Sequence, residues 1–155
     1  MGNAKETQRI SEDHNELPVV VAVDDEQILL DFYEEVLKPY CKLYAFNNVK
    51  DALAFISNNK VALVITDRHI PFMSGDELCS RLRSQPQTQS LPIIVVSGME
   101  KDIEEIAEMM TKKSIETYLT KPLSIDRLVS NVKFYLKLEK SIPVTSEKQM
   151  IIDNM

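Results

Sequence analysis

The stretch from Val61 to Gly75 reads VALVITDRHIPFMSG, an apolar run that ends on an acid and continues into a loop. A short apolar run bounded by turn signals is typical of a strand buried on both faces of a parallel sheet. Asp67 would then stand at the carboxyl end of a central strand, the edge at which open α/β sheets bind ligands. Pro71 and Gly75 punctuate the loop that follows. Asp67 alone could be an ordinary loop acid, so its meaning depends on what stands at the ends of the other strands.

Four further segments predict strands. Val19–Val23 and Ile93–Val96 are continuous apolar runs, and Leu43–Phe46 and Ile115–Thr120 are shorter or more mixed. Between the predicted strands, apolar residues recur at helical spacing. The segments with this spacing are residues 29–37, 49–56, 78–82, 103–110 and 125–136. Five strands alternating with five helices predict right-handed crossovers and an α/β fold, a doubly wound (βα)5 flavodoxin-like sandwich with a five-stranded parallel sheet.

The length of 155 residues predicts one folded domain with a polar segment at each end. Residues 1–17 are polar and lack periodicity, so we expect a disordered tail. We expect the folded domain over residues 18–140 and a C-terminal tail over residues 141–155. The starting methionine and the polar tails favour a stand-alone protein over a piece of a longer hybrid protein.

Composition excludes several classes of function. A net charge of −6 argues against binding to nucleic acid or to an anionic membrane. No apolar segment approaches the roughly 20 residues that span a bilayer, and no apolar stretch follows the N-terminal basic residues as in a signal peptide. The two cysteines, Cys41 and Cys79, lack the spacing of metal ligands and predict reduced, buried thiols. We therefore expect a cytoplasmic protein.

Polar side chains stand at four of the predicted strand ends. Asp24 and Asp25 follow the first strand, Asp67 the third, Ser97 the fourth and Lys121 the fifth. Parallel strands place these ends along one edge of the sheet, so the groups can converge. Clustered carboxylates repel one another unless a cation lies among them, and oxygen ligands suit Mg²⁺. A carboxylate nucleophile, a divalent ion, a lysine and a hydroxyl together can transfer a phosphoryl group to aspartate.

Each of these residues also has an ordinary structural explanation. Acids before a helix, such as Asp24 and Asp25, are commonly N-caps, and Ser97-Gly98 is a usual turn. A lysine before a proline, as at Lys121, is ordinary in a solvated loop. The joint placement at successive strand ends is what favours a site.

The pattern resembles the receiver domains of two-component response regulators. The resemblance spans about Pro18 to Lys140. It rests on Asp24-Asp25 after an apolar strand, Asp67 followed by Pro71 and Gly75, Ser97, and Lys121-Pro122. It implies a phosphorylation-dependent signalling switch that changes the face formed by the fourth helix, fifth strand and fifth helix.

The resemblance also implies an acceptor and a metal site. Asp67 would accept the phosphoryl group. Asp25 and Asp67 would bind Mg²⁺ directly, with Mn²⁺ as an alternative ion. Asp24 would act through water, and the backbone carbonyl of His69 would complete the ligands from the protein.

Further residues would serve the switch and the lifetime of the phosphorylated state. Lys121 would contact the phosphoryl group, Ser97 would reorient to bond it, and Tyr118 occupies the aromatic switch position. His69 and Met99 stand at positions that affect the rate of phosphoryl loss. The chain departs from the family where Lys112-Lys113-Ser114 replaces the common Gly-Ala turn, and the interval from Ser97 to Lys121 is longer than usual, which leaves the shape of the fourth helix open.

The resemblance implies partners and excludes steady enzymatic turnover. The phosphoryl donor would be a sensor histidine kinase or a histidine phosphotransfer protein, and the output would be contact with a downstream protein. The chain would be a monomer or a phosphorylation-dependent dimer, without nucleic-acid binding or membrane insertion. Its chemistry would be limited to phosphoryl acceptance and autodephosphorylation.

Two alternatives stand beside the switch. A magnesium-dependent phosphohydrolase with an aspartate nucleophile generally needs a second acid two residues after it, where this chain has His69. A pseudo-receiver would serve only as a binding module, although all the key residue types are present.

Overall fold

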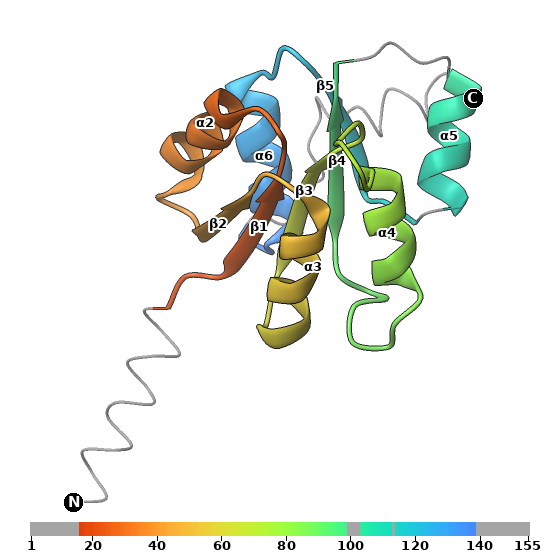
Figure 1. The fold of residues 1–155 in the computed structure, drawn as a ribbon. Coiled ribbons are helices and arrows are strands. Elements are labelled where there is room, and N and C mark those ends of the chain that lie inside the picture. Colours follow the sequence, from red (N-terminus) through yellow and green to blue (C-terminus); the bar gives the residue numbers. More distant parts are fainter. Residues whose placement is uncertain (1–15, 99–102, 113, 139–155) are drawn as a thin grey trace, which may run out of the picture.

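The computed structural model describes residues 16–98, 103–112 and 114–138. These residues form strands that alternate with helices (Figure 1). The order is β1 Val19–Val23, α2 Gln27–Leu37, β2 Lys42–Phe46, α3 Val49–Asn58, β3 Leu63–Asp67, α4 Gly75–Arg83, β4 Ile93–Ser97, α5 Ile103–Lys112, β5 Thr117–Thr120 and α6 Ile125–Tyr135. The predicted α/β fold is confirmed.

The five strands form one parallel sheet in the order β2-β1-β3-β4-β5. The register pairs Val23 with Thr66, Asp67 with Val96, and Ser97 with Thr120, so neighbouring strands end close to the same level. All carboxyl ends therefore open onto one edge of the sheet. This edge is at the top of Figure 1.

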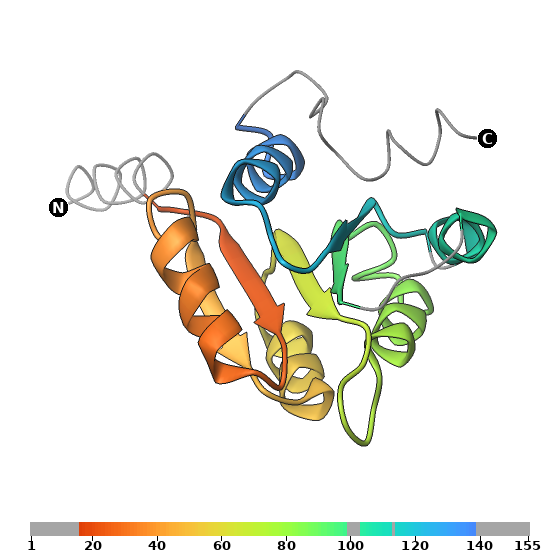
Figure 2. The same cartoon turned by 90° about the horizontal axis from the view of Figure 1, so that it is seen from above.

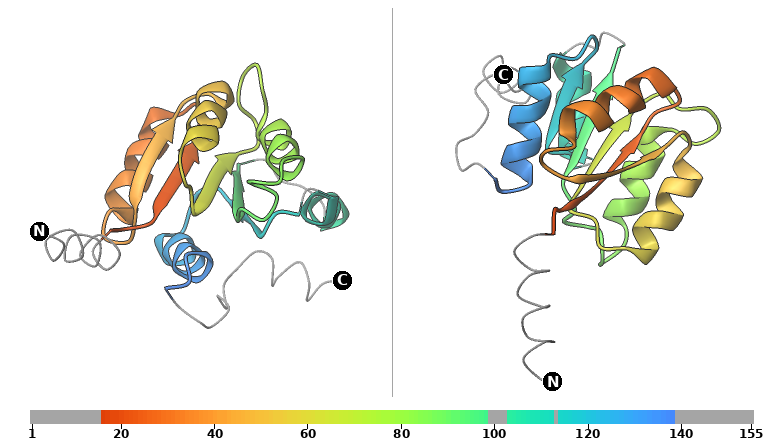
Figure 3. Two further views of the ribbon diagram at one scale, coloured as in Figure 1. Left: turned by 90° about the horizontal axis from the view of Figure 1, so that it is seen from below. Right: turned by 90° about the vertical axis from the view of Figure 1, so that its left-hand side faces the viewer.

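Helices cover both faces of the sheet. On one face, α2 and α6 contribute Tyr33, Leu128 and Val132 to an apolar cluster with the even-numbered residues of β1. On the other face, α3 and α4 pack against the sheet, and α5 adds partly buried residues to this second cluster. Figures 2 and 3 show the sheet between these two layers of helices. Because β1, β3 and β4 are covered on both sides, their sequences are apolar except for the last two residues of β3 and the last residue of β4.

Two strands begin later than their apolar runs predict. β3 begins at Leu63, although Ala62 N already donates a hydrogen bond to Val19 O at 2.8 Å. β5 begins at Thr117 although Glu116 N donates to Ile93 O at 2.9 Å. The register thus extends beyond the regular strands. The apolar pattern marks the buried segment, whereas the strand is the shorter part with continuous pairing.

Local caps fix the ends of the helices that frame the sheet edge. The side chain of Ser74 accepts a hydrogen bond from Glu77 N at the start of α4, and Ser124 accepts from Arg127 N at the start of α6.

No helix within the described ranges has the length and hydropathy needed to cross a membrane. The predicted tails lie largely outside the described residues, which begin at Glu16 and end at Leu138.

Candidate functional site

A lysine at the carboxyl edge of the sheet holds three carboxylates together. Lys121 Nζ lies 3.2 Å from Asp24 Oδ2, 3.1 Å from Glu26 Oε1 and 3.3 Å from Asp67 Oδ2. The four side chains come from the ends of β1, β3 and β5 and from the start of α2. Three carboxylates around one ammonium leave an excess of negative charge at this edge.

Burial makes this excess of charge costly. Asp24 is fully buried and Asp67 is 6% exposed, whereas Glu26 reaches in from the surface. Burial raises the pKa of Asp24 above its usual value, and the charge of Asp67 adds to the effect. Burial would lower the pKa of Lys121, but the hydrogen bond to Glu26 and the charges of Asp24 and Asp67 outweigh it and raise that pKa. The ammonium of Lys121 is therefore kept charged, while the three carboxylates around it repel one another.

The backbone around the two buried acids fixes their positions. Asp24 Oδ1 accepts a hydrogen bond from Glu26 N at 2.8 Å, and Asp67 Oδ1 accepts one from His69 N at 3.4 Å. The loop after Asp67 is closed by Gly75 N, which donates to Arg68 O at 2.9 Å. A Cβ at Gly75 would lie 2.0 Å from Asp67 O, so this close approach requires glycine.

The three acids fit a hard divalent cation. Asp24, Glu26 and Asp67 each offer one oxygen, and these atoms lie within 4.8 Å of one another. Oxygen-only donors with few carboxylates are what Mg²⁺ prefers, since it keeps waters and binds phosphate oxygens as well. A cation here would also offset the excess negative charge. The residues present therefore fit Mg²⁺.

The structure brings together three of the residues expected at the site and separates others from the group. Asp24, Asp67 and Lys121 meet as predicted. Asp25 is exposed and lies outside the group of three carboxylates, to which Glu26 contributes the third. The signal that could have pointed to Glu26 is the run of three acids from 24 to 26, whose last member begins the next helix.

The remaining predicted residues lie along β4 and β5 and in the loops. Ser97 is buried at the end of β4, and its carbonyl accepts a hydrogen bond from Lys121 N at 3.1 Å. Tyr118 is fully buried within β5. His69 is exposed in the loop after β3, and Met99 lies outside the described residues.

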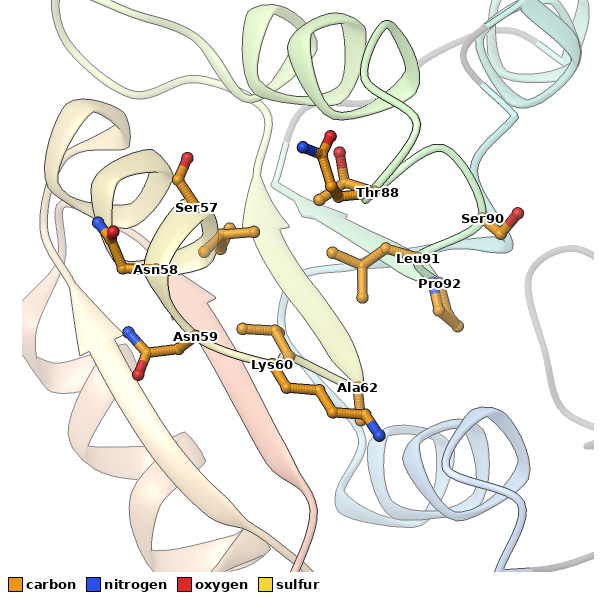
Figure 4. Close-up of a pocket in the computed structure, with 12 residues that line it drawn as sticks. Ser57, Asn58, Asn59, Lys60, Ala62, Thr88, Ser90, Leu91 and Pro92 are labelled. Atoms are coloured by element: carbon orange, nitrogen blue, oxygen red, sulfur yellow. The ribbon is translucent and has the colours of Figure 1, made fainter.

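A separate hollow of about 540 Å³ opens at the opposite, amino edge of the sheet. It lies between the end of α3 and the loop before β4 (Figure 4). Its polar lining consists of amides, hydroxyls and the amine of Lys60, without a carboxylate among the residues that line it. The residues that line this hollow therefore offer no carboxylate ligand for a cation.

Comparison with known proteins gives a family match over most of the chain. The family model described as "Response regulator receiver domain" matches residues 7–133. Hybrid signal transduction histidine kinase D of Dictyostelium discoideum is 29% identical over 131 residues, which are 83% of this chain and 8% of the kinase. Regulatory protein VanR of Enterococcus faecium is 27% identical over 130 residues, 83% of this chain and 54% of VanR. The chain thus spans about half or less of the length of these curated relatives.

Solved structures agree with this match over nearly their whole length. The signal receiver domain of an HD domain-containing protein from Pseudomonas fluorescens has a TM-score of 0.70 and 27% identity, covering 81% of this chain and 99% of that one. The receiver domain of a Francisella response regulator has a TM-score of 0.70 and 28% identity, covering 78% of this chain and 98% of that one. The similarity therefore extends to the complete fold of a single domain.

Proposed function

The chain belongs to the response regulator receiver domain family of two-component systems, and we propose that it is a signalling switch in which Asp67 accepts the phosphoryl group. One observation carries the choice of acceptor. Asp67 is the acid that ends the central strand, and its carboxylate lies 3.3 Å from the amine of Lys121, which also contacts the buried Asp24. An oxygen held at the open edge of a sheet in this way is positioned to act as a nucleophile.

The proposed reaction is an in-line exchange of one bond to phosphorus for another. An oxygen of Asp67 attacks the phosphorus of a phosphohistidine, the P–N bond breaks, and the imidazole leaves and takes up a proton. An acyl phosphate forms on Asp67. Lys121 stabilises the charge on the transferring oxygens. Mg²⁺, when bound, supplies further positive charge for the phosphoryl oxygens. Asp25 and Asp67 would hold the ion directly, and Asp24 would hold it through water. The backbone carbonyl of His69 would complete the ligands from the protein.

The new group would change what Lys121 and Ser97 contact. A phosphoryl group adds close to two negative charges at pH 7. Lys121, now bonded to three carboxylates, would turn to the phosphoryl oxygens, and Ser97 would donate a hydrogen bond to them. Tyr118, on the neighbouring strand β5, would change its position when Ser97 moves. These movements would alter the α5–β5–α6 face, which is the face expected from the sequence to contact a partner.

We further propose the setting of the switch from the family and the composition. The donor is a histidine kinase or a histidine phosphotransfer protein, the target is another protein, and the compartment is the cytoplasm. The folded unit spans residues 18–140. Its own chemistry is the acceptance of a phosphoryl group and the slow loss of that group, and His69 and Met99 would affect the rate of this loss.

Intact mass measurement tests the acceptor. The full chain is incubated with Mg²⁺ and acetyl phosphate, and we expect one labile phosphoryl addition. Asp67→Asn should show none, while the matched control Asp31→Asn, at an exposed acid on α2, should be labelled like the native protein. Equal labelling of Asp67→Asn and the native chain would overturn the assignment of Asp67. Absence of label from both would overturn the switch itself.

A further inference from the structure

The loop after Asp67 carries a fully exposed aromatic side chain at its tip. The side chain of Phe72 is as exposed as in an extended peptide, at 109%. Its neighbour Pro71 is exposed as well. Figures 2 and 3 show this loop standing out from the sheet edge beyond α4. Among the exposed large apolar side chains of the described residues it is the most exposed, and nothing in the described part of the fold removes its ring from water.

The backbone at Phe72 is also held in an unfavourable conformation. Phe72 has a φ of 71°, a region that bulky residues rarely adopt. Met73 N donates a hydrogen bond to Pro71 O at 2.9 Å, which closes a γ-turn with Phe72 at its centre. Turns of this kind with positive φ are rare and strained. Glycine at this position would relieve the strain, so the phenylalanine costs the loop some stability. Backbone strain of this kind is typical of residues that serve a function.

The loop tip lies within the area that a donor protein must cover. Phe72 follows Asp67 by five residues, so their Cα atoms are at most about 17 Å apart. A protein interface of standard size covers about 800 Å² on each partner, which corresponds to a disc with a radius of about 16 Å. The greatest possible distance is thus comparable to the radius of the interface, so a protein that brings a phosphohistidine to Asp67 can contact the ring of Phe72. Exposed aromatic residues at such positions are typical anchors of binding.

We propose that Phe72 is an anchor for the phosphoryl donor protein, inserting its ring into an apolar hollow beside the donor's phosphohistidine. This inference rests on the proposed function of Asp67. The exposed acids Asp25 and Glu26 border the same edge. The matching donor surface therefore combines an apolar hollow for the ring with neutral or basic residues facing these acids.

Comparison of a protein donor with a small donor tests the anchor. The protein donor is the autophosphorylated kinase or phosphotransfer protein, from a purified panel, that labels the full native chain most rapidly. For Phe72→Gly we expect kcat/KM with this donor to fall about ten-fold or more, mainly through KM. Phe72→Leu should keep the rate within about three-fold, because leucine also fills an apolar hollow. Labelling by acetyl phosphate should be unchanged in both variants. Leu138→Ala, at an exposed apolar residue three positions after the end of α6, is the matched control and should keep both rates.

Each other outcome has a distinct meaning. Unchanged transfer from the protein donor to Phe72→Gly would overturn the anchor while leaving Asp67 as the acceptor. Loss of labelling by both donors in Phe72→Gly would assign Phe72 to the shape of the loop and would also overturn the anchor. If Phe72→Gly abolished concentration-dependent self-association in gel filtration and left transfer intact, the ring would bind a second copy of this chain instead. Failure of the native chain to accept acetyl phosphate would overturn the proposed function.

Discussion

At the scale of single residues, the neighbouring acids Asp25 and Glu26 have different surroundings. Glu26 Oε1 is bonded to Lys121 Nζ, whereas Asp25 is exposed and lies outside the group of carboxylates. We expect Asp25→Asn to weaken Mg²⁺ binding about ten-fold, because Asp25 is the direct ligand that we propose, and Glu26→Gln to change it less than about three-fold. Calorimetric titration of the unphosphorylated chain with Mg²⁺ measures both, with Asp31→Asn as control. The reverse order of effects would place Glu26 in the metal site.

The distinction between these two acids shows where sequence prediction of the site ends. Asp24, Asp67 and Lys121 were predicted together because each ends a segment whose burial the apolar pattern reveals. Glu26 was missed because its position depends on how far the flexible Lys121 side chain reaches across the edge. No periodicity encodes that reach. Side-chain pairing between distant segments has to be observed.

A buried thiol gives a prediction about pH. Burial raises the pKa of Cys41 to about 12, and the charge of Glu34 adds to the effect. Its Sγ lies 3.5 Å from Leu37 O, to which the thiol donates. Because the folded pKa exceeds the unfolded one, the contribution of Cys41 to stability is complete below the unfolded value. It is lost as pH rises toward about 12.

Urea unfolding at pH 8 and pH 11 measures this loss. We expect the native chain to lose more stability between these values than Cys41→Ala does, while Cys41→Ala is the less stable of the two at pH 8. The buried tyrosines ionise equally in both chains, so the difference isolates the thiol. An equal loss in both would show that Cys41 ionises as freely when folded as when unfolded.

At the scale of elements, the contact between the end of β3 and the start of α4 leaves no room for a side chain at residue 75. A Cβ at Gly75 would meet Asp67 O at 2.0 Å and Arg68 Cα at 3.1 Å, both of them backbone atoms. We expect Gly75→Ala to lower the free energy of unfolding by about 2–4 kcal/mol, as overpacking and backbone displacement do. Acetyl phosphate should also label it more slowly, because Asp67 itself is displaced.

Gly98 offers a matched control at the end of the next strand. A Cβ there would lie 3.6 Å from Lys121 Cβ and Cδ, which is an ordinary contact. Gly98→Ala should therefore change the free energy of unfolding by less than about 1 kcal/mol. Urea unfolding and intact mass measurement compare the two variants. Equal stability of both would show that the loop after Asp67 moves aside without cost.

The elements also show which structural features a linear pattern conveys. Apolar runs predicted the central strands, since burial on both faces leaves a continuous signal. They did not predict the clamp around Arg83, which donates to Leu91 O at 2.7 Å and to Ser114 O at 2.7 Å. Arg83 also bonds Glu116 Oε1 at 3.1 Å, and this carboxylate accepts a hydrogen bond from Ile93 N at 2.7 Å. Arg83 thus ties α4 to the segments before β4 and β5 through polar partners that are distant in sequence.

At the scale of the whole molecule, two apolar layers hold the strand ends in register and so build the site. The same sheet residues that fill the clusters on either face position Asp24, Asp67 and Lys121 at one edge. Fold class was therefore predictable from the alternation of strands and helices. The direction in which the exposed β3–α4 loop projects was not, because a solvent-exposed loop leaves no apolar pattern.

The proposed limits of the folded unit give a prediction at this scale. The buried residues of both clusters lie between Val20 and Val132. Lys42 N donates to Pro18 O at 2.9 Å, so residue 18 belongs to the unit, whereas Glu16 forms only an exposed ion pair with Lys42 at 3.8 Å. We expect a chain of residues 18–140 to unfold with a free energy within about 1 kcal/mol of the full chain, because an exposed ion pair contributes little. Its labelling by acetyl phosphate should be unchanged.

A further truncation supplies the comparison. A chain of residues 22–140 lacks Val20 and Val21, which are fully buried in the middle of β1, and we expect it not to fold. Circular dichroism during urea unfolding measures the three chains. A loss of more than about 2 kcal/mol on shortening to residues 18–140 would mean that the flanking segments pack against the domain, since such a loss exceeds what an exposed ion pair provides. The sheet edge that carries Asp67 would then depend on more of the chain than its two apolar layers.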